Sequence, residues 1–248
     1  ASILQLVLTD VLAVLQRVIE RSYIGDQYLF NEEGTPQIAG ATVFNDDRVK
    51  VFDRENKCVR TIDVSADTII IDSTLVDEKR DTYVLFTGLH EGGHFVAHPG
   101  VFRRLEGQLD LFGGMAARYP STLRCRRDIV FGRHYKTHFT TQHEHREHQA
   151  NTLAAAWAMP RPTFIPVATG SHTEAGFRDG ILVYENEFDL DLMRDPEIIK
   201  SIARVFGVSK AAATVQLKRQ GLMMTKNEYM QRRHQMVVAF NVDYSSGL

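Results

Sequence analysis

Cysteine is scarce in this 248-residue chain: Cys58 and Cys125 are the only two, and they lie far apart without a C-x-x-C pattern. Two distant thiols do not provide the disulfide framework of small secreted domains, so the composition favours a reducing cytosol. An excess of charge of one sign is also lacking, because 29 basic residues nearly balance 31 acidic ones and leave a net charge of -2. We therefore expect no general attraction to nucleic acid or to membrane surfaces.

A hydrophobic run long enough to cross a membrane is missing as well. The apolar-rich stretch 3–19 contains Asp10, Gln16 and Arg17, and it is too short and too polar to span a bilayer. It also lacks the basic leader and the small-residue cleavage pattern of a signal peptide. Its apolar residues recur at helical spacing, which predicts a helix packed on the core, with a partner-binding helix as the alternative. Together these features predict a cytoplasmic protein.

The remaining composition, 44% hydrophobic and 24% charged, is typical of a globular protein with one large domain or two small ones. Residues 23–72 are predicted to be rich in strands, with polar–apolar alternation over 48–52 and a β-branched run over 68–72. Helical spacing follows over 82–97 and again over 143–159. This order predicts an α+β fold in which helices flank a small sheet.

The C-terminal third is predicted to be mostly helical after loops and short strands over 166–187. Helices are expected over 196–206 and 210–219, with Ser209 as N-cap of the second and Gly221 just beyond its end. Helix, tight turn, helix is also the outline of a DNA-binding motif. Because the second helix has few basic side chains, we do not expect direct nucleic-acid binding. A salt-dependent shift with duplex DNA would favour the DNA-binding alternative.

The run His90-Glu91-Gly92-Gly93-His94 carries the strongest chemical signal. On a helix, residues four apart lie on the same face, so both imidazoles can bind one Zn²⁺ ion. The intervening glutamate is then placed to take a proton from water at the metal. This H-E-x-x-H pattern is the zincin metallopeptidase signature, and it makes His90 and His94 candidate zinc ligands and Glu91 the candidate general base. The alternative is a surface helix with solvated histidines, which the apolar residues at helical spacing disfavour.

Three glycines, Gly88, Gly92 and Gly93, lie within the same predicted helix. Each costs about 1 kcal/mol of helix stability relative to alanine. We interpret this cost as a sign of close packing against a strand or a substrate backbone.

A catalytic zinc site commonly has three protein ligands and an open position for water, so a third ligand is required. A third histidine on the same helix, His98, would lie about 6 Å further along its axis, which predicts a supporting or structural role. The other dense source of ligands is the segment 143–151. We choose Glu147 as the third ligand and Asn151, one turn further on, as the side chain that orients a ligating histidine. Glu144 is the competing candidate, since it shares a face with Glu147.

Three segments resemble the ImmA/IrrE family of metallopeptidases. Residues 83–94 are similar to the family's F-T-x-x-H-E-x-G-H, and residues 147–155, followed by Met159-Pro160, are similar to its E-x-x-A-N-x-x-A-A and Met-Pro. Residues 203–222, which contain Phe206-Gly207-Val208-Ser209, are similar to a helical segment near the family's C-terminus. Gly92 departs from the pattern, because a larger apolar residue is usual there, and the stretch between the two catalytic segments is long.

The resemblance implies that zinc is bound by His90, His94 and Glu147, with Glu91 as the general base. It also implies an intracellular role, in which a helix-turn-helix repressor is cleaved or inactivated in mobile-element or stress control.

We therefore predict a zincin-like metallopeptidase domain over residues 1–165, with an insertion at about 99–142, followed by a mostly helical region over 166–248. The predicted activity is that of a zinc-dependent endopeptidase acting on a regulatory protein. The alternative is a non-proteolytic regulatory protein of the same fold, which uses zinc structurally and controls a repressor by contact alone. A partner that stays intact on gels, yet loses DNA binding, would favour this alternative.

Overall fold

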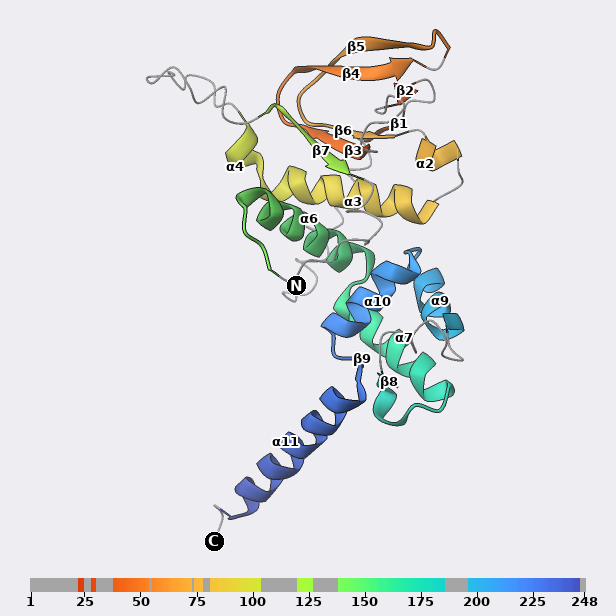
Figure 1. Ribbon diagram of the computed structural model, residues 1–248, viewed down its shortest axis with the longest axis vertical. Coiled ribbons are helices and arrows are strands. Elements are labelled where there is room, and N and C mark those ends of the chain that lie inside the picture. Colours follow the sequence, from red (N-terminus) through yellow and green to blue (C-terminus); the bar gives the residue numbers. More distant parts are fainter. Residues whose placement is uncertain are drawn as a thin grey trace, which may run out of the picture. The chain divides into compact units, whose positions relative to one another are not determined.

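The computed structural model divides the chain into two compact units, residues 1–158 and residues 159–248. It describes residues 22–24, 28–29, 38–53, 55–72, 74–77, 81–103, 120–126, 138–185 and 196–245 (Figure 1). The helix predicted over 3–19 and much of the insertion predicted at 99–142 lie outside these residues. The boundary between the units falls shortly before the one that we placed between 165 and 166.

The first unit combines strands and helices in the order that the sequence predicts. Its elements are β1 (Ser22–Ile24), β2 (Tyr28–Leu29), β3 (Ile38–Val43), β4 (Asp47–Asp53), β5 (Cys58–Val64), β6 (Thr68–Ile71), α2 (Thr74–Asp77), α3 (Asp81–Ala97), α4 (Pro99–Phe102), β7 (Thr122–Arg126) and α6 (Gln142–Ala158). One sheet has the strand order β1-β6-β3-β7, and a second has the order β2-β4-β5. Figure 1 shows α3 along one face of the larger sheet and α6 beside α3. The predicted α+β class is confirmed.

Strand β6 explains how the layers are held together, because it is buried on both faces. Ile69 and Ile71 pack toward α3, where they form a cluster with aromatic and aliphatic side chains of that helix. Ile70 points the other way and packs with Val49 and Val51 of β4. A β-branched run without polar alternation is the pattern expected of a strand with helix on one side and sheet on the other.

Two glycines let α3 approach its neighbours closely. A Cβ atom at Gly40 of β3 would lie 2.7 Å from Cγ2 of Thr87 and 3.2 Å from Cγ of Glu91. A Cβ atom at Gly93 would lie 2.9 Å from the carbonyl oxygen of Ala150 in α6. The close packing predicted from the helix glycines is thus present at Gly93, but its partner is a helix backbone. Helix α3 is held between β3 and α6 at the level of the H-E-x-x-H run.

The second unit is mostly helical. Its elements are α7 (Arg161–Glu174), the 3-10 helix η1 (Arg178–Gly180), β8 (Leu182–Tyr184), α9 (Pro196–Val205), α10 (Lys210–Arg219), β9 (Met223–Thr225) and α11 (Lys226–Ser245). The helices predicted over 196–206 and 210–219 are confirmed, and Ser209 Oγ accepts a hydrogen bond from the backbone N–H of Ala212 at 3.1 Å. Among the described residues, no helix has both the length and the apolar character needed to cross a membrane.

The loops predicted to start at residue 166 were wrong where α7 continues to Glu174. Pro162 lies in the first turn of α7, where a backbone N–H would have no partner within the helix, so this proline does not prevent the helix from forming. Pro166 is accommodated inside the helix. The predicted short strand content is represented by β8.

Candidate metal centre

Helix α3 and helix α6 bring three predicted ligands together. The Nε2 atoms of His90 and His94 lie 3.0 Å apart, and both side chains are 0% exposed. Glu147 reaches this pair from α6, with Oε2 3.3 Å from Nε2 of His90 and Oε1 3.3 Å from Nε2 of His94. Residues separated by more than fifty positions in the chain thus present nitrogen and oxygen atoms to one point.

Hydrogen bonds on the far side of each ring fix which nitrogen faces that point. Nδ1 of His90 lies 2.9 Å from Oδ1 of Asn151, and an amide oxygen only accepts, so this nitrogen carries the hydrogen. Nε2 of His98 likewise donates to Oε1 of Gln149 at 2.9 Å, which leaves Nδ1 of His98 to accept from Nδ1 of His94 at 3.0 Å. In the neutral form of each imidazole, the Nε2 atom therefore directs a lone pair at the other ring and at Glu147.

Lone pairs at this spacing repel one another unless a cation lies among them. Both buried oxygens of Glu147 also lack a hydrogen-bond partner among the described residues. Tetrahedral Zn²⁺ with bonds of about 2.0–2.1 Å holds its nitrogen and oxygen ligands about 3.3 Å apart. The separations of 3.0 and 3.3 Å among His90, His94 and Glu147 fit this requirement.

The pKa shifts agree with a site that requires positive charge. Burial lowers the pKa of His94 to about 4, which favours its neutral form. Burial also opposes protonation of His90, but the proximity of Cys125 and Glu147 outweighs it and raises the pKa of His90 well above its ordinary value. Burial opposes ionisation of Glu147 too, yet the neighbouring histidines hold its pKa below the ordinary value. The lowered pKa keeps Glu147 in its charged form beside the two rings.

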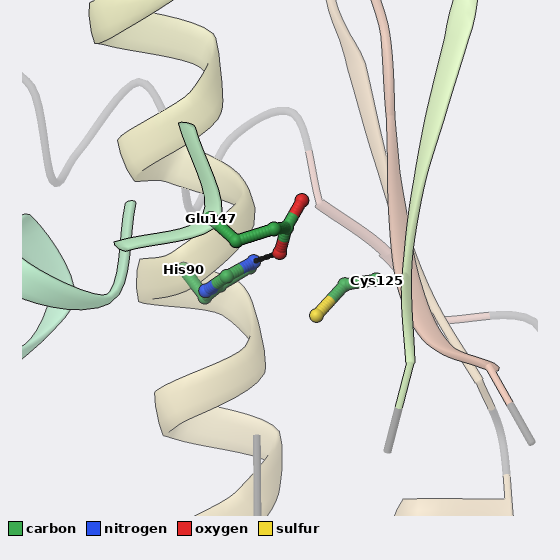
Figure 2. A group of neighbouring side chains, drawn as sticks. All are labelled: His90, Cys125 and Glu147. Carbon is green, nitrogen blue, oxygen red and sulfur yellow. Dashed lines mark ion pairs between the residues drawn. The ribbon is translucent and has the colours of Figure 1, made fainter. Parts of the chain in front are cut away.

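Cys125 is a candidate ligand that sequence reasoning missed. A ligand atom of each of His90, Cys125 and Glu147 lies within 4.8 Å of the others, and all three residues are buried, so this group could hold a metal ion. Figure 2 shows Cys125 on the sheet side of the His90–Glu147 pair. Strand β7 places it there because Cys125 pairs with Gly40 of β3, where side chains of α3 approach the sheet closely. The alternation of Thr122–Arg126, with Leu123 and Cys125 inward, was the available signal.

Glu91, the predicted general base, lies against the sheet on the same helix turn. Its Oε2 accepts a hydrogen bond from Oγ1 of Thr42 at 2.6 Å, whereas its buried Oε1 has no hydrogen-bond partner among the described residues. The side chain is 0% exposed, and burial raises its pKa from 4.5 to about 7. This carboxylate is therefore held on one oxygen and available on the other.

The competing residues are placed elsewhere. Oε2 of Glu144 accepts hydrogen bonds from the backbone N–H groups of Thr140 and Thr141, so this residue caps the start of α6. His98 touches His94 through its ring but does not face Glu147, in agreement with the supporting role predicted for it. Asn151 contacts His90 as predicted.

Comparisons with protein-family models, with curated proteins and with solved structures found no match for this chain. The chemistry of the site therefore has to be argued from the arrangement of its own residues.

Proposed function

We propose that this chain is a zinc-dependent endopeptidase with a zincin-like fold. The observation that carries the proposal is the convergence of the Nε2 atoms of two imidazoles and the Glu147 carboxylate at ligand spacing. Two imidazoles and one carboxylate are a ligand set of catalytic zinc, and they leave a fourth position for water or substrate. Glu91 follows the first of these histidines directly, which is the position of the general base in the H-E-x-x-H pattern.

The residues of the site divide the work of peptide hydrolysis among them. His90, His94 and Glu147 would hold the zinc ion, which supplies a Lewis acid that polarises the scissile carbonyl and makes water more acidic. Glu91 takes the proton of the attacking water on Oε1, while Thr42 holds Oε2. Glu91 then passes this proton to the leaving amine.

Further side chains hold the ligands in place. Asn151 fixes the ring of His90, and the chain of hydrogen bonds from His94 through His98 to Gln149 fixes the second ring. Such contacts set the orientation and basicity of each ligand without touching the substrate.

The resemblance of residues 83–94, 147–155 and 203–222 to ImmA/IrrE metallopeptidases supports a regulatory protein as substrate. A helix-turn-helix repressor is the proposed target. Direct DNA binding is not part of the proposal, because Lys210, Lys218 and Arg219 are too few for a strong basic recognition face.

Metal content and cleavage test the proposal together. We expect wild type and Glu144→Ala to retain one zinc ion per chain, and Glu147→Ala to lose it, because the two glutamates share a helix but only one faces the histidines. Glu91→Gln should keep zinc and lose cleavage of a purified repressor or of unfolded casein. Full zinc retention by Glu147→Ala, or undiminished cleavage by Glu91→Gln, would overturn the assignment.

Burial of the site favours a second candidate function. His90, Glu91 and His94 are all 0% exposed, so a substrate cannot reach them without a conformational change. A non-proteolytic regulator that uses its metal structurally would need no such access. A repressor that releases DNA while remaining intact, in the presence of zinc-loaded wild type and of Glu91→Gln alike, would select this function.

A further inference from the structure

Among the residues that the structure describes, Cys125 has a buried thiol near the proposed zinc ligands, and the peptidase mechanism leaves this thiol without a role. Cys125 is 1% exposed and packs beside Ala39 and Ile69 at the face of the sheet that α3 covers. A buried cysteine is often no more than a small apolar residue. Here, however, its sulfur also lies within 4.8 Å of a nitrogen of His90 and an oxygen of Glu147.

We propose that Cys125 is a fourth metal ligand, which closes the position that a catalytic zinc ion leaves open. The inference rests on the proposed metal site and concerns its regulation. Thiolate is a strong ligand for zinc, and a coordinating thiol is deprotonated. Two histidines, one glutamate and one cysteine would then give zinc four protein ligands, as in structural sites, and leave no position open for water.

The position of the sulfur is close to that of a bound ligand. In a tetrahedral zinc site the sulfur lies about 3.5–3.6 Å from the neighbouring ligand atoms, given bonds of about 2.3 Å to sulfur and 2.0–2.1 Å to nitrogen. The ligand atoms of His90, Cys125 and Glu147 all lie within 4.8 Å of one another, so the sulfur needs to approach by no more than about 1 Å to reach this spacing. The other three ligands already lie at binding distance from one another.

The fold provides a way for this ligand to withdraw. His90, His94 and Glu147 are held by the central helix α3 and by α6, whereas Cys125 belongs to β7. Among the described strands, β7 lies at the edge of the four-stranded sheet and pairs with β3 alone. An outward shift of β7 would remove the thiolate and open the buried site on the same side. We infer that the metal-loaded chain is latent until this strand moves.

Cobalt(II) in place of zinc tests the inference by a signal that does not depend on activity. We expect the Co²⁺-loaded wild type to show visible d–d bands of a tetrahedral site and a near-ultraviolet sulfur-to-cobalt charge-transfer band. Cys125→Ala should lose the charge-transfer band but keep tetrahedral d–d bands. The matched control is Cys58→Ala, which removes the exposed cysteine of β5 and should leave both signals unchanged.

The outcomes separate this inference from the proposed function. Visible bands without a charge-transfer band in wild type would overturn the role of Cys125 and show that it is only a packing residue, while the three-ligand site would stand. Failure of wild type to bind cobalt would overturn both. The charge-transfer band, together with faster cleavage of unfolded casein by Cys125→Ala than by wild type, supports latency. If the band is present but neither protein cleaves casein or a purified repressor, latency and the peptidase activity fail and the closed metal site remains.

Discussion

A single methyl group added at Gly93 should separate the two helices that form the metal site. The Cβ atom of Gly93→Ala would lie 2.9 Å from the carbonyl oxygen and 3.0 Å from Cα of Ala150, and both of these are backbone atoms that cannot rotate away. Favourable contacts between carbon atoms are about 3.5–4.0 Å, so α3 and α6 must move apart by roughly 0.5–1 Å. Overpacking of this kind costs about 1–3 kcal/mol.

Gly88→Ala is the matched control, because it is the same substitution in the same helix. Its Cβ atom would meet only Cδ1 of Ile71 at 3.5 Å, which is an ordinary contact. Alanine gains about 1 kcal/mol over glycine in a helix, so the control should be as stable as wild type or more stable. At Gly93 the same gain offsets only part of the overpacking, and we expect a net loss of up to about 2 kcal/mol.

Thermal unfolding of the metal-free proteins and zinc affinity by chelator competition measure these effects. A chain of this size loses about 2–4 °C in Tm for each kcal/mol, so Gly93→Ala should unfold several degrees below Gly88→Ala. Zinc affinity should fall about tenfold or more in Gly93→Ala, because the ligands of α3 and α6 move apart, and should stay unchanged in the control. Equal Tm values, or unaltered zinc binding by Gly93→Ala, would show that the glycine does not set the helix spacing.

Three further predictions follow from single side chains. Asn151→Ala should weaken zinc binding about 10–100-fold, because His90 loses the acceptor that orients its ring, and retention of full affinity in chelator competition would contradict this role. Burial raises the pKa of Glu91 from 4.5 to about 7, so this group ionises at a lower pH in the unfolded chain than in the folded one. The free energy of unfolding of metal-free wild type should therefore fall by about 3 kcal/mol as the pH rises from 4.5 to 7. Denaturant titrations at pH 4 and pH 8 should show this loss in wild type and not in Glu91→Gln. Hydrogen bonds from Asn56 and Arg60 hold the pKa of Asp53 below its ordinary value of 3.8, so the stability that this carboxylate provides is present above that pH and is lost as the pH falls below it. Asp53→Asn should therefore be less stable than wild type at pH 7, and the difference should shrink in acid; a difference that does not vary with pH would exclude a contribution from the charge.

The candidate metal centre could be predicted from sequence to the extent that its geometry is local. The four-residue spacing of His90 and His94 determines that their rings share a helix face, whatever the rest of the chain does. The one-turn spacing of Glu147 and Asn151 similarly explains how one helix can offer both a carboxylate and a supporting amide. That α3 and α6 lie side by side, with these faces toward each other, is a tertiary fact that no local pattern contains.

Cys125 shows where local reasoning fails. It lies between Arg124 and Arg126, which are typical of a solvated segment, but strand alternation turns those two side chains outward and Cys125 inward. The contact with the histidines further requires the register in which Cys125 pairs with Gly40. A pairing between residues so far apart in sequence depends on the whole sheet, and the sequence alone offered no means to choose it.

Helix α3 has an unusual run of eight consecutive buried residues, Thr87–His94. Most helices keep one side in solvent, where substitutions are nearly neutral. Here all eight residues of two turns are buried, so we expect nearly neutral substitutions only beyond the run, for example at Leu85 or Val96, which are both exposed. Neutral substitutions in this protein should therefore accumulate on both sides of Thr87–His94 and be rare within it, whichever metal ion or substrate the protein binds.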